Sequence, residues 1–172
     1  MTIKRYFLSL ILLLSIVAST LAGGVGTWKN YLAYSDVQWV EEGGNKLYVL
    51  ASNSLYTYNK NDQSIKTYDK VNGLSDSDIR FIAWNKTARR LVILYSNNNI
   101  DLLDDRGNVT NVPDYYLKTT MADKTVNGID MSGVYCYLST VFGLVKLNVA
   151  KAEISDSYNL SFPVNYSYIE SG

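Results

Sequence analysis

Short apolar runs alternate with polar turns along most of this chain, and one run returns at a fixed interval. Residues 47–50 (Leu-Tyr-Val-Leu) return as 91–94 (Leu-Val-Ile-Leu) and again as 135–138 (Tyr-Cys-Tyr-Leu), and both steps are 44 residues. A period of about 40–50 residues built from short strands is typical of propeller blades. Because one such unit cannot bury its apolar face alone, the copies are expected to stack side by side.

Each repeat is predicted to hold four short strands, because aromatic and β-branched residues favour strands and polar turn residues separate them. The predicted strands, in chain order, are 37–40, 47–51, 55–59, 65–68, 79–84, 91–95, 100–103, 109–112, 126–131, 134–138, 144–149 and 153–158. The second strand of each unit is almost continuously apolar, which predicts that both of its faces are covered. The expected fold is all-β: a partial β-propeller with antiparallel blades at about 35–72, 79–116 and 126–160.

Three blades are fewer than the roughly four to eight that close a propeller ring. Residues 165–169 resemble the opening strand of a fourth unit, so we expect an incomplete, truncated propeller domain over 23–172. Two explanations stay open: later blades of a longer protein close the ring, or copies of the chain self-associate. Residues 28–34, which precede the first repeat, are interpreted as an outer strand of the last blade.

The N-terminal segment has the three parts of a secretory signal peptide. Lys4 and Arg5 precede an apolar run over 6–17, and small residues at 18–22 lead to Gly23. The alternative is a membrane anchor, but this run has 12 residues, whereas a spanning helix needs about 20. Residues 1–22 are therefore predicted to be cleaved. The protein is expected to be exported to the periplasm or the outer-membrane cell surface, with no transmembrane segment left after cleavage.

Charge and cysteine content bear on the class of partner. The chain has 16 basic and 16 acidic residues, and loss of Lys4 and Arg5 with the signal peptide would leave a net charge of −2. This balance gives no electrostatic basis for binding nucleic acid or an anionic membrane. Cys136 is the single cysteine, so no disulfide can form within the chain. Its apolar neighbours predict a buried thiol.

Residues for common catalytic sites are absent or poorly placed. The sequence contains no histidine, which removes Ser-His-Asp and Cys-His nucleophile systems and histidine metal sites. Carboxylate pairs can serve glycosidases, but each pair here lies in a predicted turn, where acids are ordinarily solvated: Glu41/Glu42, Asp76/Asp78 and Asp104/Asp105. We therefore expect a protein that is not an enzyme and that uses no cofactor or metal.

Strand alternation sorts the connections to two ends of the sheets. The turn between the second and third strands of each unit falls at the same end as the loop to the next unit, so this face gathers asparagine-rich loops. Because binding residues favour loops on a rigid scaffold, we expect the ligand or partner site here. The candidate residues are Asn53, Asp76, Asn97, Asn98, Tyr115, Tyr116 and Phe142. The alternative is that Asn, Ser and Gly are simply good turn formers.

Large aromatic residues are predicted to fill the spaces between blades. The residues concerned are Trp39, Tyr48, Trp84, Tyr95 and Tyr137. A role in stacking on sugar rings is the alternative interpretation, and a buried position between sheets is the preferred one.

Several stretches resemble known propeller sequences. Residues 72–79 (Asn-Gly-Leu-Ser-Asp-Ser-Asp-Ile) resemble the interblade motif of the two-component regulator propellers of Bacteroidetes. Residues 51–59, 96–102 and 28–34 are similar to the N-terminal propeller of the PorZ-type family of the type IX secretion system. The sensor propellers usually carry a Trp-Phe-Gly-Thr strand that only 140–147 approaches, which favours the PorZ-type resemblance.

The PorZ-type resemblance implies a non-catalytic interaction module at the cell surface. It further implies a longer protein with two propellers and a C-terminal β-sandwich, in a complex that processes secreted cargo and attaches it to lipopolysaccharide. The partners it implies are other proteins of the secretion complex, or surface glycan or lipopolysaccharide. The alternative is a periplasmic sensing propeller of a hybrid two-component system that binds an oligosaccharide.

Overall fold

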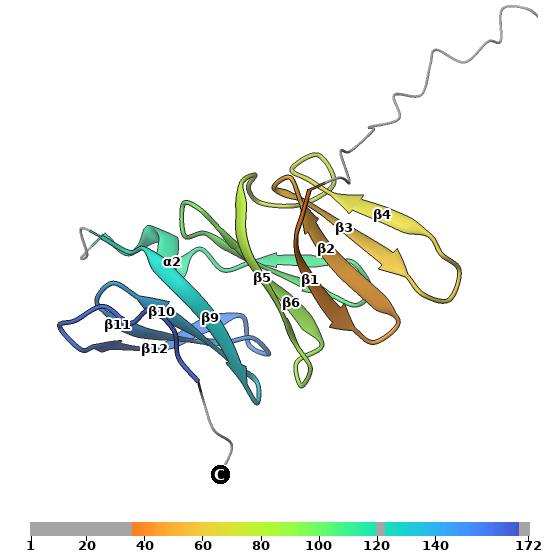
Figure 1. Cartoon of the computed structure of the whole chain (residues 1–172). Helices are drawn as coiled ribbons and strands as arrows, with labels where there is room; N and C mark the ends of the chain where they lie inside the picture. Colours follow the sequence, from red (N-terminus) through yellow and green to blue (C-terminus); the bar gives the residue numbers. More distant parts are fainter. Residues whose placement is uncertain (1–35, 120–122, 169–172) are drawn as a thin grey trace, which may run out of the picture. The chain divides into compact units, whose positions relative to one another are not determined.

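The computed structural model describes residues 36–119 and 123–168, and these form three four-stranded antiparallel sheets. In each sheet the strands lie side by side in chain order. Figure 1 shows the first sheet in orange and yellow, the second in green and the third in cyan to blue. The prediction of an all-β, partial propeller with three blades is confirmed.

All twelve predicted strands are present, with ends that differ by a few residues. The first sheet contains β1 (Val37–Gly43), β2 (Lys46–Ala51), β3 (Ser54–Asn59) and β4 (Ile65–Tyr68). The second contains β5 (Ile79–Asn85), β6 (Arg90–Tyr95), β7 (Ile100–Asp104) and β8 (Val109–Asn111). A short helix, α2 (Asp114–Leu117), follows. The third sheet contains β9 (Val126–Ser132), β10 (Tyr135–Thr140), β11 (Gly143–Asn148) and β12 (Glu153–Asn159).

The turn between β2 and β3 illustrates how the local sequence closes these hairpins. Ala51 pairs with Ser54, so the turn consists of Ser52 and Asn53 alone, with φ values of 48° and 60°. Two successive residues with positive φ are typical of a type I′ turn, whose twist matches that of the strands it joins. Asparagine enters this left-handed region more readily than most other residues, which suits Asn53 to the turn.

The core between the first and second sheets is rich in aromatic residues. Tyr48 of β2 stacks on Trp84 of β5, with ring centroids 5.2 Å apart and planes 19° apart. Gly43 is required beside them, because a Cβ at this position would lie 2.7 Å from ring atoms of both Trp84 and Tyr48. Tyr95 is also fully buried in this core. The predicted core positions of Tyr48, Trp84 and Tyr95 are confirmed.

The core between the second and third sheets is mainly aliphatic. Alternate residues of a strand point to opposite faces, so Ile93 contributes to the first core and Val92 to the second. Residues 91–95 of β6 are consequently all fully buried, as the sequence predicts for a second strand. Cys136 is also fully buried, which confirms its prediction, and burial raises the pKa of its thiol. The thiol therefore stays protonated.

Two predicted core aromatics lie outside these cores. Trp39 is 45% exposed and meets the edge of Phe81, with ring centroids 6.5 Å apart. Tyr137 is half-buried on the face of the third sheet turned away from the second, because its sequence neighbours point into the second core. It packs edge-on against Tyr135, and the Lys146 ammonium lies 5.8 Å from its ring centroid. The predicted core positions of Trp39 and Tyr137 are therefore wrong. Trp39 lies partly exposed at the rim of the first core, and Tyr137 lies on the outer face of the third sheet.

The segment after β12 differs from its predicted strand. The Val164 N–H donates to the Thr140 carbonyl at 2.9 Å, and the Ser139 hydroxyl donates to Ser167 Oγ at 3.1 Å. A strand requires a ladder of backbone bonds, and residues 165–168 form none. Residue 169 lies outside the described residues, as do the predicted signal peptide at 1–22 and the predicted strand at 28–34.

The strand ends form two edges with different connections. We call "loop edge" the edge with the β2–β3, β6–β7 and β10–β11 turns and the connections that leave each outer strand, and "hairpin edge" the opposite one. Side-chain bonds join like edges of neighbouring sheets. Asn53 Nδ2 donates to Asp78 Oδ1 at 3.1 Å on the loop edge, and Lys46 Nζ donates to the Asp105 carbonyl at 2.5 Å on the hairpin edge.

Candidate functional site at the loop edge

A buried carboxylate beneath the loop edge organises it. Asp101 of β7 is fully buried. It accepts hydrogen bonds from the Ser75 N–H and hydroxyl, both at 2.7 Å, from the Tyr95 hydroxyl at 2.6 Å and from Asn111 Nδ2 at 2.8 Å. Such bonds offset the cost of burying a charge. Asp101 therefore ties the connection between the first two sheets to strands β6 and β8.

The Tyr95 hydroxyl keeps its proton in this network. Burial raises the pKa of Tyr95, and the hydrogen bond to Asp101 raises it further. The hydroxyl therefore remains a donor to the Asp101 carboxylate.

The connection at 69–78 is anchored at several points. Leu74 is buried in the first core, and its N–H donates to the Asp69 carbonyl at 2.9 Å. Gly73 adopts a φ of +106°, a conformation that L side chains rarely adopt. Because Leu74 and Ser75 both point inward, the two acidic residues that follow, Asp76 and Asp78, are left at the loop edge.

The exposed part of the loop edge carries paired amides and carboxylates. The Asn97 side-chain amide donates to the Asp76 carboxylate, and Lys70 Nζ lies 3.4 Å from the same carboxylate. The Ser77 backbone N–H, and then the Asn97 and Lys70 side chains, hold the pKa of Asp76 below its ordinary value. Asp76 is therefore an anion at neutral pH, fixed between two sheets' loops.

The third sheet adds aromatic residues to this edge. Phe142 is half-buried against the second core, and Tyr116 is 45% exposed. The turn that carries Phe142 is held by Thr140, whose hydroxyl donates to the Gly143 carbonyl at 2.9 Å. Gly143 has a φ of +145°, and a Cβ there would lie 2.1 Å from the Tyr158 carbonyl oxygen. No other residue fits this turn without moving the strand.

The predicted site residues fall into three groups. Asp76 and Asn97 touch directly, and Asn53 binds the neighbouring Asp78. Asn98 is half-buried in the β6–β7 turn with a φ of 69°, which is the role of a turn former. The remaining three residues lie around the third sheet, and no bond joins them directly to the asparagine cluster within the described residues: Tyr115, Tyr116 and Phe142.

The prediction that Tyr115 contacts a ligand or partner at the surface is wrong. It is only 2% exposed, and its hydroxyl donates to the Lys124 carbonyl at 2.7 Å. The Lys124 ammonium in turn donates to the Tyr116 carbonyl at 2.6 Å. Tyr115 therefore supports the connection at 113–125 from inside, and Tyr116 is the member of the pair that faces outward.

Sequence reasoning missed Asp101 and Ser75. Both appear in predicted elements, Asp101 inside an apolar strand (Ile-Asp-Leu-Leu) and Ser75 inside the 72–79 motif. A lone carboxylate in an otherwise apolar strand is a signal, because carboxylates are buried only when paired or hydrogen-bonded. The sequence does not indicate which hydrogen-bond donors contact the Asp101 carboxylate.

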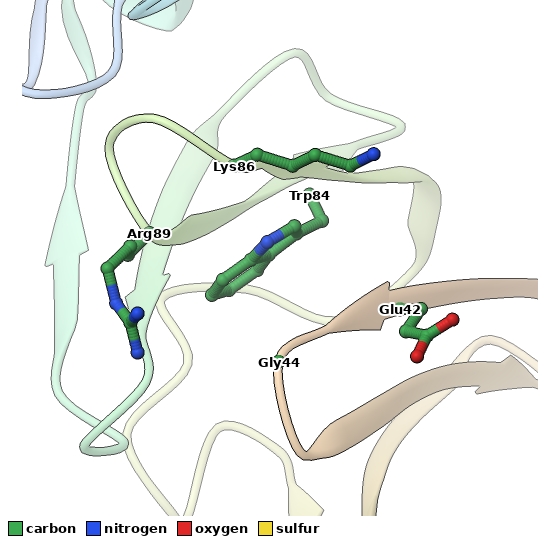
Figure 2. Close-up of a pocket in the computed structure, with 5 residues that line it drawn as sticks. All are labelled: Glu42, Gly44, Trp84, Lys86 and Arg89. Carbon is green, nitrogen blue, oxygen red and sulfur yellow. The ribbon is translucent and has the colours of Figure 1, made fainter.

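A pocket of about 380 Å³ lies at the hairpin edge, between the first and second sheets, and its lining residues are Glu42, Gly44, Trp84, Lys86 and Arg89. Figure 2 shows the Trp84 ring lying between the side chains of Arg89 and Glu42. Arg89 pairs with Asp105 at 2.5 Å, and Glu42 pairs with Lys60 at 2.5 Å. This pocket is separate from the loop-edge residues that the sequence predicts.

The described residues offer no arrangement for a metal centre, since no three acidic or cysteine side chains converge. Over 36–119 and 123–168, the helical content includes nothing both long and apolar enough to cross a bilayer. The chemical groups gathered at the loop edge are amides, fixed carboxylates and aromatic rings. Such groups recognise a partner by hydrogen bonds and apolar contact.

Comparison with known families settles which propellers this chain is related to. The family described as the TSS9, PorZ, N-terminal beta-propeller domain matches residues 47–172. The chain belongs to the PorZ N-terminal propeller family. The resemblance to PorZ-type propellers that the sequence indicated is thereby confirmed. The chain is a propeller related to the type IX secretion system. None of the curated proteins matches the chain.

A solved structure agrees with the family assignment. It is that of PorZ, described as an essential bacterial surface component of the type-IX secretion system of Porphyromonas gingivalis. It is 36% identical to this chain, with a TM-score of 0.69 over 77% of this chain. The chain spans only 18% of that PorZ chain. The activity and partners of the whole PorZ protein therefore do not follow for this chain from the match alone.

Two further structures share the fold alone. The extracellular domain assigned to the hybrid two component system BT4673 of B. thetaiotaomicron is 19% identical, with a TM-score of 0.54 over 69% of this chain and 16% of its own. Apo AztD from Citrobacter koseri is 17% identical, with a TM-score of 0.55 over 77% of this chain and 35% of its own. The sheet arrangement of this chain is therefore also found in these two more distant proteins.

Proposed function

We propose that this chain is a non-catalytic interaction module, exported to the cell surface, that works within type IX secretion. Its loop edge binds a partner during the processing of secreted cargo and its attachment to lipopolysaccharide. The partner is either another protein of the secretion complex or the surface lipopolysaccharide itself. Family membership supports the secretion system, and the loop edge supports the binding role.

The observation that carries this proposal is the fixed polar surface over Asp101. Asn97 is bonded to Asp76, and Asn53 to Asp78, so loops from the first two sheets are held in one arrangement. The buried Asp101 holds the 69–78 connection beneath them. A surface that is already ordered loses less conformational entropy when it binds, which suits recognition by hydrogen bonds.

Binding to lipopolysaccharide purified from the bacterium that encodes the chain tests the proposal. The intact chain is immobilised, and association is followed by biolayer interferometry. The double variant Asn97→Ala/Phe142→Ala removes an amide and a ring from the loop edge. Its affinity is expected to fall about tenfold or more, as for loss of contacts near the centre of an interface.

The matched control is Lys151→Ala, in a turn of the hairpin edge with a side chain 71% exposed. It is expected to bind as the wild type does. The same three proteins are then tested against purified proteins of the secretion complex, which distinguishes a protein partner from a glycan. Unchanged binding of every detected partner by the double variant would show that the loop edge is the wrong surface.

A further inference from the structure

The pocket at the hairpin edge is built from fixed side chains. Trp84 is 8% exposed because one face of its ring is stacked on Tyr48. Its backbone N–H donates to Glu41 Oε2 at 3.1 Å, which links the first and second sheets directly. Arg89 Nε donates to Asp105 Oδ2 at 3.0 Å, so the guanidinium is held in place. The pocket therefore exists before any ligand arrives.

Lys86 differs from the other charged residues of the pocket. Glu42 is engaged by Lys60, and Arg89 by Asp105. The Lys86 ammonium makes no hydrogen bond or ion pair with the described part of the chain. Lys60 is the main cause of the lowered pKa of Glu42, and the charge of Lys86 contributes less. An ammonium offers three donors, and those of Lys86 are free for a ligand at the mouth of the pocket.

The two edges also differ in charge. The turns of the hairpin edge contain five basic residues (Lys60, Lys86, Arg89, Arg106 and Lys151) and two acids (Asp62 and Asp105). The strand ends beside these turns add two bases (Lys46 and Arg90) and three acids (Glu42, Asp104 and Glu153), so bases still exceed acids at this edge. In the described connections of the loop edge, five acids (Asp69, Asp76, Asp78, Asp114 and Asp123) exceed three bases (Lys70, Lys118 and Lys124). The near-zero charge of the whole chain hides this separation. A basic edge attracts an acidic partner over several ångströms.

The pocket chemistry favours a peptide over a sugar. Sugar recognition uses an exposed aromatic face and side-chain amides or hydroxyls. Trp84 is only 8% exposed, with one face stacked on Tyr48, and the side chains of the five lining residues carry no amide or hydroxyl. The volume of about 380 Å³ is within the range of small binding sites. Arg106, next in the chain to the Asp105 that pairs with Arg89, adds positive charge beside the pocket, which an extended acidic segment can use and a small carboxylate cannot.

We propose that the hairpin-edge pocket binds an acidic peptide segment of a partner protein. One carboxylate of the segment bonds to the Lys86 ammonium and to the free edge of the Arg89 guanidinium. A neighbouring apolar side chain covers the exposed part of Trp84. This is a second binding surface, at the opposite edge from the loop-edge residues, and it stands or falls independently of them.

Isothermal titration of the intact chain with two acetylated hexapeptide amides tests this site. The probe is Gly-Leu-Asp-Asp-Leu-Gly, and its matched control is Gly-Leu-Asn-Asn-Leu-Gly. The acidic peptide is expected to bind, and Lys86→Glu to weaken it about tenfold or more. Because the contact is between charges, raising the ionic strength from about 0.05 M to about 0.5 M is expected to weaken binding by the wild type.

Lys151→Glu is the matched charge reversal, on the same edge but in the third sheet. It is expected to change the affinity by less than about twofold, and equal melting temperatures would show that both variants are folded. Three results would overturn the proposal: neither peptide binds, both reversals weaken binding equally, or polygalacturonate binds through Lys86 while the acidic peptide does not. The last would assign the pocket to an anionic glycan.

Discussion

The interface between the first and second sheets and that between the second and third are built differently. The first combines stacked rings with buried charge: Tyr48 lies on Trp84, and Asp101 accepts bonds from three residues. The second is mainly aliphatic, with Leu138 and Val145 fully buried. One sheet, the second, contributes to both.

This difference shows how one repeat serves two purposes. Aliphatic packing is non-directional and tolerates changes that keep volume. Buried hydrogen bonds to a carboxylate are directional and require each donor in place. The first interface therefore fixes the 69–78 connection and the pocket beside Trp84, whereas the second mainly holds two blades together.

The sharpest test of the first interface is Asp101→Ala. It leaves the Ser75 N–H, the Ser75 hydroxyl and the Tyr95 hydroxyl without their acceptor, whereas the Asn111 amide keeps Asn99 Oδ1 and the Ile100 carbonyl, both at 3.0 Å. The variant should destabilise the fold by about 4 kcal/mol. Urea unfolding of the intact chain measures this loss. Asp101→Asn keeps the shape and one acceptor oxygen, so about half the loss is expected. Equal stability of all three proteins would remove Asp101 from its central role.

The corresponding test of the second interface is Leu138→Ala. Removing a fully buried leucine should cost about 3 kcal/mol through lost burial and the cavity left behind. The control is Leu138→Met, which keeps most of the volume and should cost less than about 1.5 kcal/mol. A large loss for methionine in the same unfolding assay would show that this interface is as specific as the first.

A smaller effect is expected for Asp76→Asn at the loop edge. The pKa of Asp76 is lowered in the folded protein, so its contribution is present above the ordinary value of 3.8 and is lost as pH falls through the lowered value. The variant should lose about 1 kcal/mol at pH 7. The difference from the wild type should shrink below about pH 3. A difference that is independent of pH would contradict the ionic role.

The smallest effect concerns two tyrosines of the first interface. The Tyr48 hydroxyl is buried without a hydrogen-bond partner in the described structure, so Tyr48→Phe should be neutral or stabilise the fold by up to about 1 kcal/mol. Tyr95→Phe is the matched change, and it should destabilise because Asp101 loses a donor. Thermal melts of both variants give the sign. A destabilised Tyr48→Phe would reveal a partner for that hydroxyl.

Much of the fold follows from period and alternation. The 44-residue repeat of the 47–50 run leads directly to β2, β6 and β10, because strands with the same pattern occupy equivalent places in each blade. The rim position of Trp39 could not be predicted, since period alone does not say how far a ring projects beyond its neighbour. The strand expected at 165–168 is missing because a ladder depends on a partner strand as well as on residue type.

The sequence predicts at which edge most candidate residues lie, but it does not predict which residues contact one another there. Strand alternation correctly brings Asn53, Asp76 and Asn97 to the loop edge, because each lies in a turn at the same end of its sheet. Tyr115 was misplaced, since a connection long enough to fold back can bury its own aromatic residue. The Ser75–Asp101 contact joins residues 26 apart, and no local pattern encodes that pairing.

The most direct test of the loop edge as the recognition surface is photo-crosslinking in the bacterium that encodes the chain. A photoreactive residue is placed at Asn97 on the loop edge or at Lys151 on the hairpin edge. Adducts that contain a secretion-complex protein or lipopolysaccharide are expected at Asn97. The absence of such adducts at Asn97, with or without adducts at Lys151, would contradict the account.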